Sequence, residues 1–236
     1  MTPLYLDNHL LVVDKPAGML AQGDATGDRD LVSWAKGYLK ERFDKPGNVF
    51  VGLVHRLDRP TSGVVVLART SKAAGRLADQ FRRRRPDKRY LAVLDGVLDP
   101  SGEAADGIVK RDGGGVRVVS PDHPGAQRAA LRWRTLAADG RQSLVEVELL
   151  TGRKHQIRAQ LAARGAPVAG DFRYGDATPW AGGRGIALHA WRLTVEHPTR
   201  REPVTFSAPP PEAWAGHFED AVERLVGSGA PPPAGA

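Results

Sequence analysis

The segment His55–Gly63 carries the residues of this chain that are best suited to chemistry. It reads His-Arg-Leu-Asp-Arg-Pro-Thr-Ser-Gly, with a single carboxylate, Asp58, between two arginines. Apolar stretches flank it, and the turn formers Thr61, Ser62 and Gly63 can hold Asp58 at a strand end facing a cleft. An acid between two arginines is more commonly an ion-paired loop anchor, so the segment alone leaves both interpretations open.

A strongly basic stretch follows this segment. Between Lys72 and Arg89 eight basic residues stand against two acidic ones, and the whole chain carries a net charge of +7. Such an excess favours a polyanion as partner. The alternative is a solvated helix end in an arginine-rich protein, because basic patches also serve solubility.

Composition excludes several other kinds of chemistry. The chain has 236 residues and no cysteine, so disulfides, thiolate metal sites and a cysteine nucleophile are excluded. No signal peptide and no apolar run long enough for a membrane span is visible, which favours a cytoplasmic protein that binds no membrane. The spacing of His55, His155 and Asp171 matches no metal template, and no nucleophile-elbow motif surrounds Ser62. We therefore expect neither a metal, nor a cofactor, nor hydrolase chemistry.

The elements that must position Asp58 follow from hydrophobic periodicity. The patterns predict one continuous α+β domain over residues 1–226, with a Gly-, Ala- and Pro-rich tail, 227–236, expected to be disordered. Ser71 is expected to cap the helix that ends in the arginine run before Pro86. Residues 99–125 are expected to form a hairpin insertion. Strands are predicted at 10–14, 49–53, 64–68, 90–97, 144–150, 186–195 and 204–206, and helices from 30, from 71, at about 154–163 and at 211–226.

Several short motifs resemble those of one known family in the same order along the chain. His55–Gly63 resembles the HRLDxxTSG signature of the RluA-like RNA pseudouridine synthases at every fixed position. Further segments resemble that family's NKPAG, KxYxAx, TGRxHQIR, GDxxYG and LHA elements; they are Val13–Gly18, Lys88–Val93, Thr151–Arg158, Gly170–Gly175 and Leu188–Ala190. Asp14 stands where the family commonly has Asn. Lys154 and Gln160 also depart from the family's usual residues, which bears on substrate choice rather than on activity.

The resemblance implies isomerisation of uridine in RNA, in which the N1–C1′ glycosidic bond is broken and remade at C5. It assigns Asp58 as the catalytic carboxylate, Arg158 as its ion-pair partner and Tyr90 as the platform on which the uracil stacks. Whether Asp58 attacks C1′, attacks C6 or abstracts a sugar proton stays open at this point. Leu188 is expected to close the other side of the base.

The target uridine must be flipped out of the RNA to reach a buried carboxylate. The resemblance gives Arg56 the role of filling the resulting gap or holding the flipped nucleotide, and His55 that of fixing the loop. Basic residues before and within the KxYxAx element are then expected to contact the RNA backbone; they are Arg82, Arg83, Arg84, Arg85, Lys88 and Arg89.

The resemblance also implies a fold, with a central, mainly antiparallel mixed sheet flanked by helices and loops and an active cleft across the sheet. The KPAG-like segment begins so early that no S4 domain is expected before it, which leaves target selection to the basic helix and to residues 99–125. Ribosomal RNA and transfer RNA both remain open as substrates, and a monomer is the default. The alternative function is a catalytically silent RNA-binding or ribosome-assembly protein on the same fold.

Overall fold

One mixed β-sheet runs through the whole computed structural model, which describes residues 1–176, 178–180, 183 and 185–229. Within these residues eleven strands form the order β1-β2-β4-β10-β5-β9-β8-β6-β7, with β3 paired to β4 and β11 to β10. The β4–β10 pair is parallel and the other strand pairs are antiparallel. The strands are β1 (Pro3–Leu6), β2 (Leu10–Lys15), β3 (Gly52–Leu53), β4 (Ser62–Ala68), β5 (Asp87–Asp95), β6 (Ser101–Lys110), β7 (Val116–Val119), β8 (Gln127–Ala138), β9 (Gln142–Leu149), β10 (Leu188–Glu196) and β11 (Pro203–Ser207).

Strands β2 and β4 are apolar on both faces because a helix covers each face. Their alternate residues enter two separate hydrophobic clusters, one with Leu11 and Val65 and the other with Leu10 and Val66. The first cluster contains the buried side of α1 (Leu31–Arg42), and the second contains that of α2 (Ser71–Arg82). This two-sided burial explains why residues 64–68 read as an uninterrupted apolar run.

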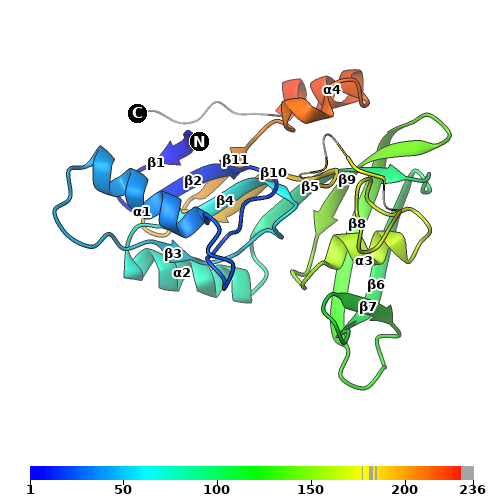
Figure 1. Ribbon diagram of the computed structural model, residues 1–236, viewed down its shortest axis with the longest axis horizontal. Helices are drawn as coiled ribbons and strands as arrows, with labels where there is room; N and C mark the ends of the chain where they lie inside the picture. The colour runs from blue at the N-terminus through cyan, green and yellow to red at the C-terminus, as the bar shows by residue number, and fades with distance from the viewer. Residues whose placement is uncertain (177, 181–182, 184, 230–236) are drawn as a thin grey trace.

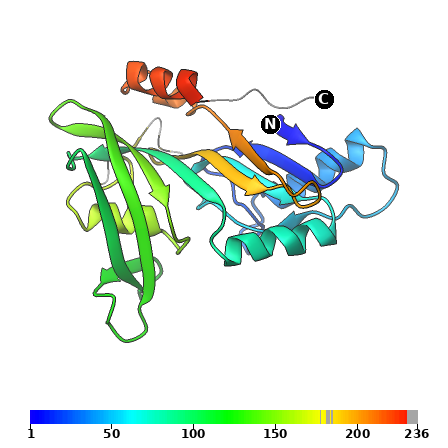
Figure 2. The ribbon, with the colours of Figure 1, turned by 180° about the vertical axis from the view of Figure 1, so that it is seen from behind.

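The other half of the sheet carries the remaining helices. Helix α3 (Gln156–Ala162) lies beside β6 and β7, and the 3₁₀ turn η2 (Glu212–Trp214) and α4 (Glu219–Gly229) pack on the same cluster as α1. Figure 1 shows α1 and α2 over the part of the sheet that contains β2 and β4, with α3 over the part that contains β8 and β6. Figure 2 gives the same arrangement from behind. None of the helices in the described residues combines the length and the apolar character needed to cross a bilayer.

The mainly antiparallel α+β sheet is confirmed, while several predicted element boundaries are wrong. Thr70, not Ser71, caps α2, because its hydroxyl accepts the amide of Ala73, and the helix ends at Arg82. Residues 99–125 are no separate hairpin insertion, since β6 pairs with both β7 and β8 and so extends the main sheet. The predicted helix 211–226 is interrupted, because Gly216 at φ 80° separates η2 from α4. Helix α4 continues through Gly229, and residues 230–236 of the predicted tail lie outside the described residues.

Gly63 lies where β4 and β10 approach each other, and a substitution at this position tests how closely they pack. Its φ is 122°, and a Cβ at this position would lie 2.4 Å from the carbonyl oxygen of Ala190. We expect Gly63→Ala to lower the free energy of unfolding by about 3 kcal/mol, because both the backbone conformation and the space exclude a side chain. The matched control is Gly75→Ala in the exposed face of α2, where nothing lies within 4 Å; it should raise stability by up to about 1 kcal/mol. Urea denaturation of the two variants measures the difference, and equal midpoints would contradict this packing.

Candidate active site

The loop between β3 and β4 presents Asp58, and a buried lysine holds the backbone of that loop. Lys15, at the end of β2, is fully buried, and its Nζ donates to three backbone carbonyls, including that of Arg59 at 3.3 Å. The amide of Gly18 donates to the same Arg59 carbonyl at 2.8 Å. Burial lowers the pKa of Lys15 to about 8, although the charges of Asp58 and Asp14 act against this. The KPAG-like segment and the loop that carries the carboxylate are thus tied together by charge-assisted hydrogen bonds.

The end of the same loop is fixed by a buried histidine on β10. Ser62 Oγ lies 2.9 Å from Nδ1 of His189, whose Nε2 lies 3.0 Å from the carbonyl oxygen of Ala208. A carbonyl only accepts, so Nε2 carries the proton and Nδ1 accepts from the serine hydroxyl. Burial lowers the pKa of His189 to about 4, which keeps this arrangement neutral. The TSG and LHA motifs therefore serve to fasten the Asp58 loop to the sheet.

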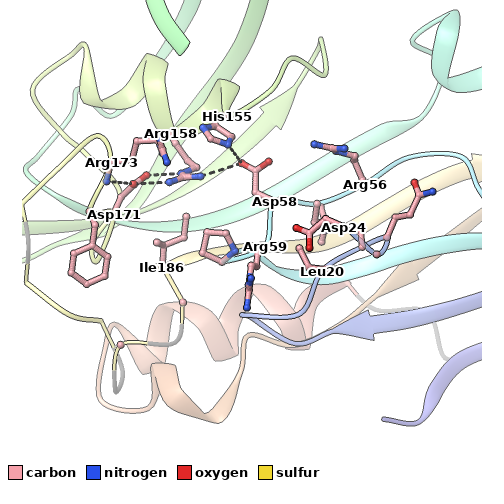
Figure 3. A pocket seen from close by; sticks show the side chains of 18 residues that line it. Leu20, Asp24, Arg56, Asp58, Arg59, His155, Arg158, Asp171, Arg173 and Ile186 are labelled. Carbon is pink, nitrogen blue, oxygen red and sulfur yellow. Dashed lines mark hydrogen bonds and ion pairs between the residues drawn. The ribbon is translucent and has the colours of Figure 1, made fainter. Parts of the chain in front are cut away.

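Arg158 on α3 joins two carboxylates that are far apart in the sequence. Its Nε and Nη2 donate to the two oxygens of Asp171 at 2.6 and 2.7 Å, and its Nη1 lies 3.4 Å from Oδ2 of Asp58. Figure 3 shows Asp58 with Arg158 and His155 on one side and Arg56 on the other. Burial acts to lower the pKa of Arg158, but the hydrogen bonds and charge of Asp171, followed by those of Asp58, raise it. The guanidinium is therefore a permanent cation, oriented by Asp171 and aimed at Asp58.

The Asp58 carboxylate is held in place but keeps free capacity to accept hydrogen bonds. Its side chain is 20% exposed, whereas that of Arg158 is 6% exposed and that of Asp171 is fully buried. Among the residues that the structure describes, the one side-chain hydrogen bond to Asp58 is made by Arg158 to Oδ2. Oδ2 is thus oriented by the Arg158 cation, while the partial exposure of the side chain leaves the carboxylate accessible to a substrate.

His155 adds a second donor beside Asp58. Its Nδ1 lies 2.8 Å from the hydroxyl of Tyr174, and that hydroxyl also accepts the backbone amide of Val116 at 2.9 Å. The tyrosine hydrogen is therefore free to point to Nδ1, which leaves the ring proton on Nε2, 3.9 Å from Oδ2 of Asp58. Burial lowers the pKa of His155, so the ring is a neutral donor at neutral pH.

Two cavities meet at Asp58. One of about 870 Å³ extends along residues 20–24 and 171–173, and one of about 480 Å³ extends towards Tyr90 and Leu188. Their shared lining is Arg56, Leu57, Asp58, His155 and Arg158. A bound polymer can therefore extend through the larger cavity past Asp58 and place one planar group in the smaller cavity.

Tyr90 and Leu188 supply apolar surface to the smaller cavity. They lie on the paired strands β5 and β10, where Leu188 is opposite Ala92, and both are buried with 8% and 4% of their surface exposed. Burial and the charge of Asp58 raise the pKa of Tyr90. Its phenol therefore stays protonated, which suits a stacking surface and does not suit a base.

The predicted RNA-binding residues divide into two groups. His55, Arg56, Arg82, Arg84 and Lys88 line the smaller cavity together with Asp58. Three others do not line either cavity; these are Arg83, which pairs with Asp79, Arg85, and Arg89, which pairs with Asp87 and Glu148. Arg89 faces away because it alternates with Lys88 and Tyr90 along β5.

Sequence reasoning missed the roles of Asp171, Tyr174 and Lys15. The GDxxYG and KPAG elements were visible as motifs, but nothing in their spacing indicates contact with Arg158, His155 or the Asp58 loop. Among the described residues, no three side chains of His, Asp or Glu type are grouped so that they could hold a metal ion.

The chain is similar in sequence to proteins named pseudouridine synthases. A family model described as RNA pseudouridylate synthase matches residues 9–163. The chain is 36% identical over 225 residues to the ribosomal large subunit pseudouridine synthase D of Xanthomonas campestris, over 89% of this chain and 66% of that protein. It is 32% identical over 228 residues to the tRNA pseudouridine synthase C of Haemophilus ducreyi, over 89% of this chain and 91% of that protein. The chain thus spans about two thirds of the first relative's length and most of the second's.

Solved structures with the same fold include two human proteins. One is titled RNA pseudouridylate synthase domain containing 4, with a TM-score of 0.75 and 25% identity over 94% of this chain and 91% of that one. The other, RNA pseudouridylate synthase domain containing 1, has a TM-score of 0.69 and 24% identity over 98% of this chain and 96% of that one. These likenesses confirm the predicted fold.

The buried neutral histidine of the site predicts how stability depends on pH. The pKa of His189 is about 4 in the fold, below its ordinary value of 6.5, so at lower pH the unfolded chain binds a proton that the folded chain does not. We expect the free energy of unfolding to fall as the pH drops from about 6.5 towards 4, by up to about 1.4 kcal/mol per pH unit from this residue. Urea midpoints between pH 7.5 and 5 measure the slope. His189→Asn should be less stable at pH 7.5 but show a shallower slope, and an unchanged slope would contradict the assignment.

Proposed function

The chain belongs to the RNA pseudouridylate synthase family, and on that premise we propose that it converts specific uridines of ribosomal or transfer RNA into pseudouridine with Asp58 as the catalytic carboxylate. The observation that carries the proposal is the position of Asp58 between two cavities, with a cation oriented towards it. The Asp58 side chain is 20% exposed and lines both cavities, as a group that reacts with a nucleotide requires.

The reaction needs an ionised carboxylate and a detached base that is held in place. Breaking the N1–C1′ bond leaves positive character on the sugar, and an anionic Asp58 stabilises it or bonds to it. Attack at C1′, attack at C6 and abstraction of a sugar proton all begin from this ionised state. The released uracil turns so that C5 faces C1′, the new C–C bond forms, and the C5 proton is replaced by one on N1. The reaction therefore consumes no co-reactant.

The smaller cavity fits the role of base pocket. Tyr90 offers a neutral aromatic face, and Leu188 offers apolar contact from the neighbouring strand. Stacking of a base on an aromatic side chain is worth about 1–3 kcal/mol, which offsets much of the cost of extruding the uridine. Arg56, which is exposed and lines both cavities, is placed to hold the flipped nucleotide or to occupy the gap it leaves.

Several further properties belong to the same proposal. Residues 1–226 act as one catalytic domain that works as a monomer in the cytoplasm, with RNA as partner and without metal or membrane. The sheet extension made by β6 and β7, together with the basic end of α2, selects the target. The catalytically silent alternative is not favoured, because a binding protein has no use for an oriented carboxylate beside Tyr90 and Arg158.

Asp58→Asn tests the catalytic assignment directly. The amide keeps the size of the side chain but can neither bond to the sugar nor stabilise its positive charge, so we expect conversion to fall by at least about 10⁴-fold. RNA binding should stay within about threefold of wild type, since Asp58 offers no attraction to phosphate. Mass spectrometry of pseudouridine in RNA from gene-deficient cells incubated with the protein measures conversion, and filter binding measures affinity. Conversion by Asp58→Asn at the wild-type rate would exclude the assignment, and no conversion by the wild-type protein would favour the silent binder.

Asp171→Asn tests the orientation of Arg158. The variant loses the negative charge that holds the Nε and Nη2 edge of Arg158, so the guanidinium is less well oriented towards Asp58. We therefore expect kcat to fall about 10–100-fold with KM nearly unchanged. The control is Asp106→Asn, which removes a partly exposed carboxylate that pairs with Arg164 at 3.0 Å outside both cavities. Thermal unfolding of both variants separates loss of fold from loss of orientation. Equal kcat values for the two variants, with both folded, would show that Asp171 does not act through Arg158.

A further inference from the structure

Lys88 is a cation in the base pocket without an anion of its own. It precedes Tyr90 by two residues on β5, so the two side chains share one face of the strand, and both line the cavity of about 480 Å³ with Asp58. Among the described residues, no hydrogen bond or ion pair involves the Lys88 ammonium. The neighbouring carboxylate of Asp87 is engaged by Arg89 at 2.9 Å and faces Arg192 at 3.9 Å. The charge of Asp87 attracts the partly buried ammonium, but none of the carboxylates in the described part of the chain forms an ion pair with it.

Arg84 lines the same cavity from a backbone position that normally belongs to glycine. It directly follows the C-cap of α2 and has a φ of 57°. Its amide donates to the carbonyl of Phe81 and that of Arg85 donates to the carbonyl of Gln80, which is the hydrogen-bond pattern of a glycine-type helix end. A long side chain here strains the backbone, so its presence calls for a compensating role.

Some arginines at the basic end of α2 form ion pairs with a carboxylate, and others do not within the described part of the chain. Arg82 and Arg83 both pair with Asp79, whereas Arg84 has no ion pair within the described part of the chain. Arg84 and Lys88, for which the described residues provide no ion pair, both line the cavity that holds Tyr90. Burial, and after it the charge of Arg84, lowers the pKa of Lys88 to about 8. The ammonium therefore remains mostly charged at neutral pH, and an anion placed between the two cations would relieve their repulsion.

The wall next to Lys88 also presents a hydrogen-bond donor. Nε2 of His55 accepts the amide of Val66 at 3.0 Å, so the proton of the neutral ring is on Nδ1. The ring stacks on Phe81 with 4.5 Å between centroids, and both residues line the cavity. The lining of this cavity thus combines two cations and a neutral donor with the Asp58 carboxylate.

We propose that Lys88 and Arg84 form a subsite for one phosphate group of the nucleotide whose base packs on Tyr90. Residues two apart on a strand are separated by about 6.6 Å, a spacing that a ribose can bridge between a base and its own phosphate. Lysine and arginine together suit phosphate, as a point charge and a planar fork of donors. The inference rests on the proposed function and adds that the enzyme holds the flipped uridine at both ends, the base and the phosphate.

Small nucleotides test the subsite without any turnover. We expect isothermal titration calorimetry at low salt to show that uridine 3′,5′-bisphosphate binds the wild-type protein at least about tenfold more tightly than uridine, because one charge-assisted contact is worth about a factor of ten. Uridine 5′-monophosphate and uridine 3′-monophosphate identify the phosphate involved. Lys88→Gln and Arg84→Gly should each remove most of the advantage and leave uridine binding unchanged.

Two controls keep the result interpretable. Lys72→Gln removes one charge from the exposed start of α2 and should retain the full bisphosphate advantage. Arg84→Gly should also raise the unfolding temperature, by about 2–4 °C, because glycine relieves the backbone strain. A variant that is more stable but binds the nucleotide less tightly cannot be explained by damage to the fold.

The outcomes that overturn the proposal are distinct from failure of the proposed function. Retention of the bisphosphate advantage in both Lys88→Gln and Arg84→Gly, or its equal loss in Lys72→Gln, would exclude the subsite. Inorganic phosphate binding as tightly as the bisphosphate would show a free-anion site and would also overturn it. Absence of RNA conversion by the wild-type protein would instead refute the pseudouridine synthase proposal, whatever the nucleotides do.

Discussion

The active site depends on one guanidinium that is divided between two carboxylates. The Nε and Nη2 edge of Arg158 is bonded to the buried Asp171, and Nη1 is left to face Asp58. The charge of the arginine is largely compensated by Asp171, so Asp58 gains an oriented donor while keeping an anionic charge of its own. A carboxylate paired with an isolated arginine would be a weaker base and nucleophile. A fully unpaired carboxylate could not be held at a fixed position.

The rest of the fold serves to bring these three side chains together. Helix α3 carries Arg158, the segment before β10 carries Asp171, and the loop before β4 carries Asp58. Lys15 holds the Asp58 loop through backbone carbonyls, and the neutral His189 fastens its far end to the sheet. The close approach of Gly63 to Ala190 sets β4 and β10 side by side at this point. Conformational freedom is thus removed around the reacting group before substrate binds, which is the usual basis of preorganised sites.

Much of this arrangement could be predicted from motifs, but the contacts between motifs could not. Asp58 and Arg158 were paired from the family resemblance, across 100 residues of sequence, and the structure places Nη1 and Oδ2 3.4 Å apart. Asp171 and Tyr174 were recognised as parts of a motif without a role, because their partners are chosen by the packing of α3 on the sheet. Strand β8 was not predicted, although Ala129, Leu131 and Trp133 recur at every second position and are buried, in a strand that lies between β9 and β6. The significance of Arg84 depends on its backbone conformation, which no sequence pattern displays.

The shared guanidinium is tested most directly by mapping pseudouridine in total RNA from cells that lack the gene. The cells would carry either the wild-type chain or Arg158→Lys, with both proteins at equal abundance. Lysine keeps the positive charge but cannot bond to Asp171 through one edge while it faces Asp58 with another atom. We expect that at least one pseudouridine disappears with the gene, returns with the wild-type chain and stays absent with Arg158→Lys. Full restoration by Arg158→Lys, or a pseudouridine map that does not depend on the gene, would contradict it.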